Sequence, residues 1–346
     1  MGQGDPSGKH QGGIVSFSEV ALKLPRRQFL HLASGAAALP TVSRMAYADD
    51  YPSRPVRLVV GFAPAGPGDI AARLIGQWLS DRLGQQFVIE NRPGAGSNIA
   101  TEAVIHAPPD GYTLLLASSS NAINATLYDD LKFNFIRDIV PITSFVRLTD
   151  AMLVNPSLPA RSVPEFITYA KANPGKTNMA TSGKGSPAHL FGELFKVMAG
   201  VDLTTVAYRG GGAALVDLLA GQVQVMFEGI SSSVGYIKAG KLRALGVTSA
   251  TRPAVLPDTP AVNEFVPGYE ATPWAGLGAP RGTPVDIVDR LNREVNVALA
   301  DPAMQGRIAD LGGTAMPGSP ADFEKLIADE TEKWGTVIRA ANIKPD

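Results

Sequence analysis

Short apolar runs alternate with longer segments of helical periodicity along most of this chain. Most of these runs end at Gly, Asn, Ser or Pro, and runs of this length and boundary are typical of buried strands. The runs that predict strands are "VRLVVGF" (56–62), "QQFVIEN" (85–91), "YTLLLAS" (112–118), "AMLVNP" (151–156), "TNMATS" (177–182), "LTTVAY" (203–208), "VQVMFEG" (223–229) and "KLRALGVTS" (241–249).

The segments between these runs carry apolar residues at helical spacing. Helices are predicted over 69–84, 187–200, 213–222 and 319–343, and the last quarter of the chain is expected to be mostly helical. In the 69–84 segment the expected apolar face consists of Ile70, Leu74, Trp78, Leu79 and Leu83. The 319–343 segment begins with Ser319 as N-cap and Pro320 at N1. Its expected apolar stripe is Phe323, Leu326, Ile327, Trp334, Val337 and Ile338.

Strand–helix alternation of this kind predicts an α/β fold, because crossover helices join parallel strands of one sheet. The alternation occurs twice, once in each half of the chain. We therefore expect two similar α/β domains that meet across a cleft, each with a mostly parallel sheet flanked by helices.

The first 48 residues have the pattern of an export signal. Arg26-Arg27 begin a twin-arginine motif, "PRRQFL", and a short apolar stretch follows it. Ala46-Tyr47-Ala48 supplies the small residues that a signal peptidase requires, so cleavage is expected after Ala48. A buried N-terminal helix is the less favoured interpretation. We predict a twin-arginine signal peptide with an extended N-terminus, Tat export and a periplasmic protein.

Charge and cysteine content narrow the range of partners. The signal region holds 5 of the 31 basic and 2 of the 32 acidic residues, which leaves 26 and 30 in the remaining 298 and a net charge of −4. A mildly acidic chain without a basic run argues against nucleic acid or an anionic membrane as partner. The sequence contains no cysteine, which excludes disulfides, thiol chemistry and a lipid-modified N-terminal Cys.

A glycine-rich turn, "GFAPAGPGD" (61–69), follows the first predicted strand and opens a helix. It fails as a P-loop because Pro67-Gly68 stand where Lys and Ser/Thr are required. Gly66-x-Gly68-x-x-Ala71 matches a dinucleotide fingerprint, with Glu90 at the end of the next strand. Four residues separate Gly61 from Gly66, which disfavours that match. An exported NAD(P)-dependent oxidoreductase therefore stays as the alternative function.

Hydrolytic and metal chemistry have little support in the sequence. Only His106 and His189 lie outside the signal region, and neither a G-x-S-x-G nor an H-E-x-x-H pattern is present. We predict no catalytic residues, no metal ligands and no cofactor. His189 lies on a helix with Leu190 and Phe191, which favours a packing or supporting role.

Four turns of one kind each follow a predicted strand and precede a predicted helix. They are "APAGPGD" (63–69), "SSSN" (118–121), "SGKGSPAH" (182–189) and "YRGGGAA" (208–214). Each presents backbone N–H groups at the positive end of a helix, where anions bind. In open α/β sheets ligands bind at the carboxyl ends of strands. The pattern predicts a small anion held from two sides, mainly by N–H groups and hydroxyls.

The same segments resemble a known family. "VRLVVGFAPAGPGDIAARL", "ENRPGAGSNIATEAV", "PPDGYTLLLASSSNAIN", "SGKGSPAHLFGELFKVMAGVDLTTVAYRGGG" and "AGKLRALGVTS" are similar to the extracytoplasmic solute receptors of tripartite tricarboxylate transporters, the Bug family. The resemblance covers 51–346. It implies a two-lobed periplasmic-binding-protein (Venus flytrap) fold that captures a small carboxylate for a membrane permease. It also implies a non-enzymatic solute-binding protein, which we expect to be a monomer.

The resemblance implies lobe boundaries and a ligand site. Lobe 1 is expected to comprise 49–151 plus 273–346, and lobe 2 to comprise 152–272. The implied ligand-binding residues are Ala65, Gly66, Asp69, Ser118, Ser119, Asn121, Ser182, Gly183, Ser186, His189, Arg209, Gly210 and Glu228. The chain departs from the family pattern at Ala65–Gly68, Pro187, Arg209 (usually Lys) and Glu228 (usually Asp).

Overall fold

The computed structural model describes Met1, residues 51–64 and residues 66–345. All the elements below lie in one compact unit, residues 48–346. The predicted Arg26-Arg27 motif, the Ala46-Tyr47-Ala48 site and cleavage after Ala48 lie outside the described residues. Within the described part of the chain, no helix has the length and apolar character needed to cross a bilayer.

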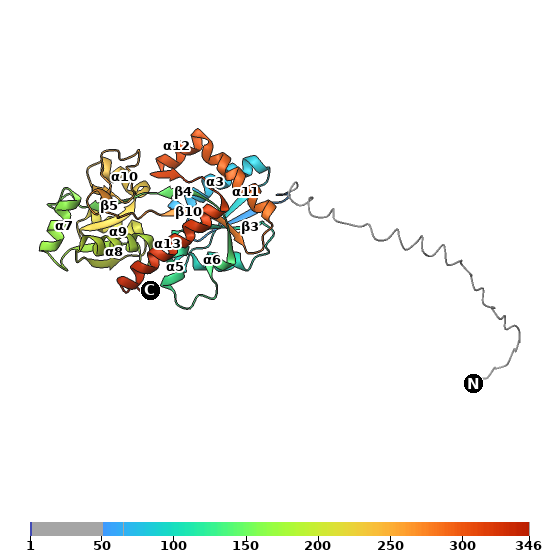
Figure 1. Ribbon diagram of the computed structural model, residues 1–346, viewed down its shortest axis with the longest axis horizontal. Helices are drawn as coiled ribbons and strands as arrows, with labels where there is room; N and C mark the ends of the chain where they lie inside the picture. Colours follow the sequence, from blue (N-terminus) through green and yellow to red (C-terminus); the bar gives the residue numbers. More distant parts are fainter. Residues whose placement is uncertain (2–50, 65, 346) are drawn as a thin grey trace. The chain divides into compact units, whose positions relative to one another are not determined.

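The first sheet has six strands, and lobe 1 is built around it (Figure 1). β1 pairs in parallel with β2 and β3, whereas β10 is antiparallel to β3 and β4, and β11 is antiparallel to β4. The carboxyl ends of β1, β2, β3 and β4 therefore lie at one edge. In spatial order the strands are β11 (Gly313–Ala315), β4 (Ile139–Leu148), β10 (Trp274–Pro280), β3 (Thr113–Ser118), β1 (Val56–Val60) and β2 (Phe87–Asn91).

The second sheet has five strands and forms the centre of lobe 2. β6 pairs in parallel with β7 and β8, and β5 is antiparallel to β8 and β9. Four strands thus share one direction, and β5 runs against them. In spatial order the strands are β7 (Thr204–Ala207), β6 (Asn178–Thr181), β8 (Val225–Gly229), β5 (Asp150–Val154) and β9 (Arg243–Val247). The predicted two-lobed α/β fold is confirmed, with mixed sheets in which most strands run in one direction.

Helices flank both sheets (Figure 1). The helices are α3 (Pro67–Leu83), α4 (Asn98–Ile105), α5 (Ser119–Leu127), α6 (Phe135–Asp138), α7 (Val163–Ala172), α8 (Pro187–Ala199), α9 (Gly211–Leu219), α10 (Ile230–Lys238), α11 (Val285–Ala300), α12 (Pro302–Asp310) and α13 (Pro320–Ala340), with 3-10 turns η1 (Ala95–Ser97) and η2 (Val262–Glu264).

The chain passes between the lobes twice. Thr149 alone separates β4 of the first sheet from β5 of the second, and the chain returns between β9 and β10. The Leu148 N–H donates to the Pro273 carbonyl, so the two crossing segments are hydrogen-bonded to each other. The predicted boundary after residue 151 falls inside β5, and the predicted boundary after residue 272 falls just before β10.

The C-terminal helix α13 follows its sequence pattern closely. The Ser319 hydroxyl accepts from the Asp322 N–H, and the Ser319 N–H donates to the Asp322 carboxylate, which forms a capping box. Phe323, Ile327, Trp334, Val337 and Ile338 are buried, and Leu326 is partly buried. The far end of the helix packs on lobe 2, where the Trp334 and Phe191 rings lie 5.3 Å apart between centroids.

The apolar face predicted for α3 is wrong in part. Ile70 is exposed, and the face that packs on the sheet is made of small residues with a few larger ones: Ala71, Ala72, Ile75, Gly76 and Leu79. A Cβ on Gly76 would lie 3.1 Å from the Ile89 side chain, so the helix sits close to β2. Leu74, Trp78 and Leu83 border this core and are partly buried.

All eight predicted strands are present, but β4, β10 and β11 were not predicted. Strand β10, "WAGLGAP", contains glycine and proline, which are rare in strands. The glycine is required by packing: a Cβ on Gly276 would lie 2.3 Å from the Phe323 ring and 2.5 Å from the Thr143 carbonyl oxygen. Local propensity could not show this long-range requirement.

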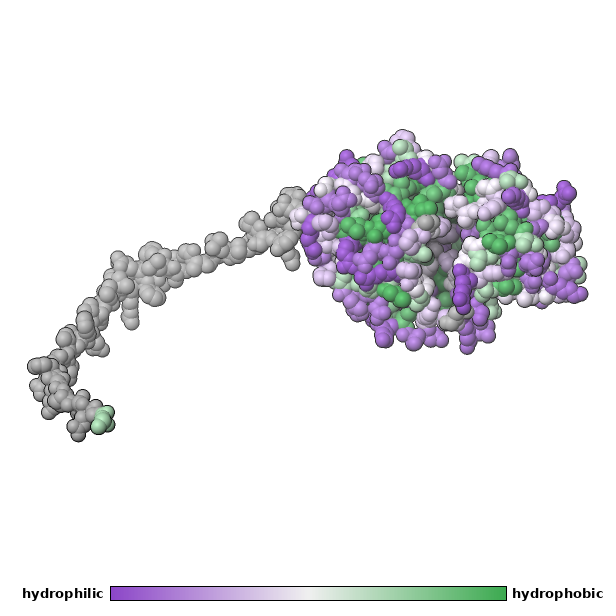
Figure 2. All heavy atoms as spheres, turned by 180° about the vertical axis from the view of Figure 1, so that it is seen from behind, coloured by the Kyte–Doolittle hydropathy of each residue, from purple (hydrophilic) through white to green (hydrophobic). Residues whose placement is uncertain are grey.

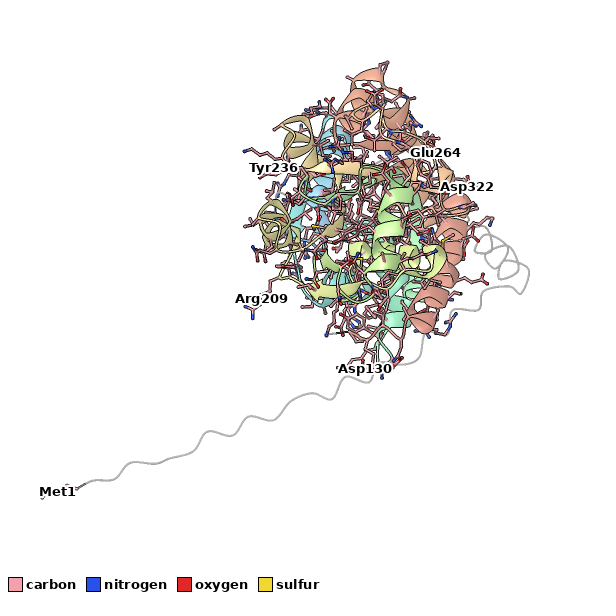
Figure 3. The ribbon with its side chains drawn as sticks, turned by 90° about the vertical axis from the view of Figure 1, so that its left-hand side faces the viewer. Met1, Asp130, Arg209, Tyr236, Glu264 and Asp322 are labelled. Atoms are coloured by element: carbon pink, nitrogen blue, oxygen red, sulfur yellow. The ribbon has the colours of Figure 1, made fainter. Side chains whose placement is uncertain are left out.

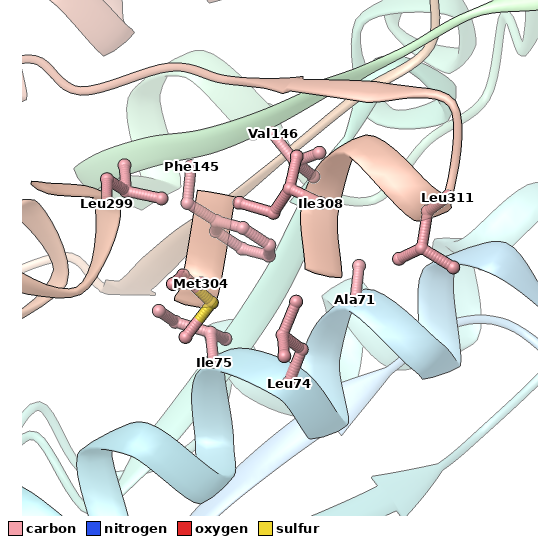
Figure 4. Close-up of a pocket in the computed structure, with 9 residues that line it drawn as sticks. All are labelled: Ala71, Leu74, Ile75, Phe145, Val146, Leu299, Met304, Ile308 and Leu311. Carbon is pink, nitrogen blue, oxygen red and sulfur yellow. The ribbon is translucent and has the colours of Figure 1, made fainter. Parts of the chain in front are cut away.

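A small cavity lies in the core of lobe 1 between α3, α12 and β4 (Figure 4). Its nine lining residues are all apolar, and its volume is about 10 Å³. A cavity of this size holds at most one water molecule, and an apolar lining offers that water no partners. This cavity is a feature of core packing and not a ligand site.

Candidate functional site

The large cleft of the structure lies between the lobes and has a volume of about 600 Å³. It is lined from lobe 1 by the turns that follow β1 and β3, and from lobe 2 by those that follow β6, β7 and β8. The carboxyl ends of strands in both sheets therefore face the same space. This is where an open α/β sheet binds ligands.

Five helices present their first turns to this cleft. The lining residues at these N-termini are Pro67 and Gly68 of α3, Ser119 and Ser120 of α5, Pro187 and Ala188 of α8, Gly211 and Gly212 of α9, and Ser231 and Ser232 of α10. Each helix has at least nine residues. Unpaired N–H groups and the helix dipole make such ends favourable for a negative charge.

The described residues that line the cleft include no lysine, arginine or histidine, and its two ionisable groups are Asp150 and Glu228. Burial and the nearby Glu228 carboxyl raise the pKa of Asp150 well above its usual range. Burial also raises the pKa of Glu228, although hydrogen bonds from Ser232 and the Gly229 backbone oppose this. An anion in the cleft would thus be held by dipoles and hydroxyls rather than by a cation.

The residues predicted from the sequence fall into three groups. Gly66, Ser118, Ser119, Ser182 and Glu228 line the cleft. Asp69, Asn121, Gly183, Ser186, His189, Arg209 and Gly210 lie in the same turns or helices but outside the lining. Ala65 lies outside the described residues.

Asp69 connects the first turn of α3 to the neighbouring strand. Its carboxylate accepts from Arg73 Nε at 2.8 Å and from Asn91 Nδ2 at 2.9 Å, and it is 1% exposed. Asn91 Nδ2 also donates to the Phe62 carbonyl. The side chain of Asp69 therefore fixes the shape of the β1–α3 turn.

Two other predicted residues cap helices at the cleft. Asn121 Oδ1 accepts from the Ser118 N–H at 2.8 Å, and Asn121 Nδ2 donates to Thr101 Oγ1, which fixes the start of α5. Ser186 Oγ accepts from the His189 N–H at the start of α8. These hydrogen bonds fix the first turns of α5 and α8, whose residues line the cleft.

His189 and Glu193 form a buried polar group on α8. His189 Nδ1 accepts from the Gly185 N–H at 3.0 Å, and its Nε2 lies 3.5 Å from Glu193 Oε1. Burial raises the pKa of Glu193, but hydrogen bonds from His189, Lys196 and Thr205 outweigh it and lower that pKa from 4.5 to about 2. His189 thus ties the serine-rich turn to the helix, in line with the predicted supporting role.

We expect the Glu193 interactions to stabilise the protein at neutral pH and to be lost in acid. A carboxyl whose folded-state pKa lies below its unfolded value contributes stability above that unfolded value, and the contribution disappears as pH falls toward about 2. The fall in unfolding free energy between about pH 5 and about pH 3, measured with urea, should be smaller in Glu193→Gln than in the parent. An equal fall in both proteins would contradict this assignment.

Arg209 and Gly210 lie at the edge of the β7–α9 turn. Arg209 is exposed, and Figure 3 shows its side chain extending away from the body of the protein. Gly210 has φ +104°, a conformation that strongly favours glycine. The following residues, Gly211 and Gly212, are the ones that reach the cleft.

Sequence reasoning missed several lining residues, among them Phe62, Asp150, Gly212, Ser231 and Trp274. One signal was available: "GISSSVG" (229–235) follows a predicted strand just as "SSSN" does. Asp150 and Trp274 gave no local signal, because they reach the cleft through the two segments that cross between the lobes.

Comparison with known proteins identifies the family. A family model described as "Tripartite tricarboxylate transporter family receptor" matches residues 71–343. The chain belongs to this family. It is 37% identical over 300 residues to Protein BugT of Bordetella pertussis, covering 86% of this chain and 92% of BugT.

Solved structures of receptors in this family share the fold. R. palustris Rpa4515 with adipate superposes with a TM-score of 0.79 at 37% identity, over 86% of this chain and 100% of that one. MatC from Rhodopseudomonas palustris with bound malate superposes with a TM-score of 0.74 at 34% identity, over 83% of this chain and 100% of MatC. Periplasmic binding protein BugD superposes with a TM-score of 0.75 at 33% identity, over 86% of this chain and 100% of BugD. The predicted family and solute-binding function are confirmed, and the oxidoreductase alternative has no support.

Much of the exposed surface in Figure 2 mixes hydrophilic and hydrophobic side chains. The exposed large apolar residues of the described chain are spread over several elements, as Val88 on β2, Val216 on α9 and Val285 on α11 illustrate. Scattered apolar side chains are ordinary on a protein surface. In this tripartite-transporter receptor the cleft is therefore the feature that requires a functional explanation.

Proposed function

We propose that this receptor captures a small carboxylate between its lobes and delivers it to the membrane subunits of a tripartite-type transporter. The observation that carries this proposal is the convergence of five helix N-termini on one cleft of about 600 Å³. Relatives with adipate and malate support carboxylates as the ligand class.

The ligand carboxylate binds at the first turns of α5 and α3 in this proposal. Ser119 and Ser120 offer hydroxyls and N–H groups, and Gly66 lets the ligand approach the backbone closely. The Cβ position of Gly66 has only the Ala63 carbonyl nearby, at 3.5 Å, and its φ of −79° suits any residue. Gly66 is therefore useful here for its small size and not for an unusual backbone conformation.

We further propose that the protein binds its ligand without altering it and acts as a monomeric periplasmic receptor. The helix N-termini bind and orient an anion, and the relatives are receptors rather than enzymes. Export by the twin-arginine route, with cleavage after Ala48, would place it where a permease can receive the ligand.

The experiment is a thermal-shift and calorimetric screen of the exported chain with mono-, di- and tricarboxylates, including aromatic and amino acids. A true ligand at 100 times its Kd should stabilise the protein by ~2.7 kcal/mol. Arg209→Ala should change the affinity by less than about tenfold, because an exposed charge contributes little. Failure of every carboxylate to bind, or recovery of a chemically altered ligand, would overturn the proposal.

A further inference from the structure

Two carboxyl groups meet at the lobe 2 side of the cleft. Strands β5 and β8 pair so that Asp150 lies opposite Gly229 and Ala151 lies opposite Glu228. The main chain of Asp150 is held on its other side, where its N–H and carbonyl both bond to the Thr248 hydroxyl. Both side chains line the cleft.

The Asp150 carboxyl is buried yet has no hydrogen-bond donor among the described residues. The residue is 6% exposed, and its hydrogen bonds with the described residues are made by its main chain. A Cβ on Gly229 would have Asp150 Oδ1, Ser231 Oγ and Ser232 Oγ at 3.7–3.8 Å, so these oxygens surround a small open space. Because Asp150 lines the cleft, its carboxyl can take a donor from water or from a ligand bound there.

Glu228 occupies the position that a second carboxylate of the same ligand would need. Its Oε1 accepts from the Ser232 hydroxyl at 2.8 Å, and the Gly229 backbone also donates to this carboxyl. A Cβ on Gly211 would lie 2.7 Å from Glu228 Oε2, so the carboxyl sits against the start of α9. A protein carboxyl therefore already fills the N-terminal ends of α9 and α10.

The lobe 1 side of the cleft lacks such an internal anion. The first turn of α5 contains no acidic residue. The acidic residue in the first turn of α3, Asp69, is turned to Arg73 and Asn91. The cleft is thus uneven: the first turns of α3, α5 and α8 attract an anion, whereas the carboxyl oxygens of Asp150 and Glu228 beside α9 and α10 attract a donor or a cation.

We propose that the ligand carries a carboxylate at one end and an amino group at the other, with the ammonium between Asp150 and Glu228. This inference rests on the proposed function and names its ligand class. An ammonium has three donors and no acceptor, which suits two carboxyls and the Ser231 hydroxyl. A second carboxylate in the same place would face two acids with no lining cation, and like charges in a buried site repel strongly.

Proton exchange distinguishes this ligand class from a dicarboxylate. The polar groups near Asp150 come from four places: Glu228 of β8, Thr248 after β9, Ser231 and Ser232 of α10, and Tyr269. Burial and the Asp150 carboxyl both raise the pKa of Tyr269. A bound ammonium favours the ionised carboxyls, so binding releases protons and strengthens as pH rises. A dicarboxylate requires a protonated carboxyl, so its binding takes up or retains protons and weakens as pH rises.

The test compares amino acids with dicarboxylates that have the same number of methylenes. The pairs are β-alanine with succinate, γ-aminobutyrate with glutarate and δ-aminovalerate with adipate, each titrated calorimetrically in two buffers of different ionisation enthalpy. We expect at least one amino acid to bind about tenfold or more tightly than its partner, with proton release. Asp150→Asn should weaken that amino acid by about tenfold or more and leave the dicarboxylate unchanged or tighter.

Controls keep the result interpretable. Asp258→Asn removes an exposed acid of lobe 2 outside the cleft lining and should alter neither ligand class. If Asp150→Asn fails to fold, Glu228→Gln replaces it as the cleft variant. The comparison of each amino acid with its matched dicarboxylate is made in the parent protein and requires no variant. Preference for the dicarboxylate in every pair, with proton uptake, would overturn this inference and leave the proposed function standing. Binding of neither class would also overturn it, and the wider carboxylate screen then decides whether carboxylate binding itself fails.

Discussion

Gly212→Phe is expected to lower the affinity for the ligand by about 100-fold while leaving the fold intact. Gly212 lies in the first turn of α9, lines the cleft and has no atom within 4 Å of its Cβ position. A phenyl group there meets open space in the empty protein but competes with the ligand for volume. Overpacking of this kind costs about 3 kcal/mol, which corresponds to that loss. Calorimetric titration with the best ligand of the screen measures it.

Gly235→Phe is the matched control. Gly235 is also an exposed helical glycine of lobe 2 with nothing within 4 Å of its Cβ position, but it lies in α10 outside the cleft lining. The Gly235→Phe variant should bind the ligand with the affinity of the parent, and both variants should have similar melting temperatures. Equal affinity of Gly212→Phe and Gly235→Phe would show that the ligand binds elsewhere.

Trp334→Ala is expected to reduce the free energy of unfolding by about 3–5 kcal/mol, the usual cost of truncating a buried Trp. Trp334 is 0% exposed. Its ring packs on Phe191 of lobe 2, and its Nε1 donates to Glu330 at 2.7 Å. The substitution leaves a cavity where α13 joins the core of lobe 2. Urea unfolding followed by circular dichroism measures the change.

Phe265→Ala provides the comparison, because Phe265 is an aromatic residue of lobe 2 that is 40% exposed. Phe265→Ala should reduce the free energy of unfolding much less than Trp334→Ala does, in the range of ordinary surface substitutions. If the two variants lose similar stability, the C-terminal helix does not anchor lobe 2 as the packing indicates.

Strands that follow the common pattern could be predicted from the sequence, and strands shaped by distant contacts could not. The runs at β1, β3 and β8 are largely apolar and bounded by turn residues, because most of each strand is covered on both faces. Strand β10 instead contains glycines that make room for Phe323 and for β4. Its position between β3 and β4 depends on the chain returning from lobe 2, which no local window contains.

The part of the cleft that the sequence predicts is the set of similar turns at helix N-termini. Turns such as "SSSN" could be placed at helix N-termini because strand, polar turn and helix follow one another in the sequence. The role of each side chain within a turn was less accessible: Asn121 holds Ser118, and Ser119 reaches the cleft. Asp150 was missed because it begins an antiparallel strand, where the usual turn-to-helix pattern is absent.

The central claim is that helix N-termini, and not a basic side chain, hold the ligand carboxylate between the lobes. A crystal structure of the exported protein with its best ligand tests this most directly. We predict a carboxylate within hydrogen-bond distance of backbone N–H groups at the starts of α5 and α3, with no Lys or Arg nitrogen within about 4 Å. A carboxylate paired with Arg209 or another cation, or bound outside the cleft, would contradict it.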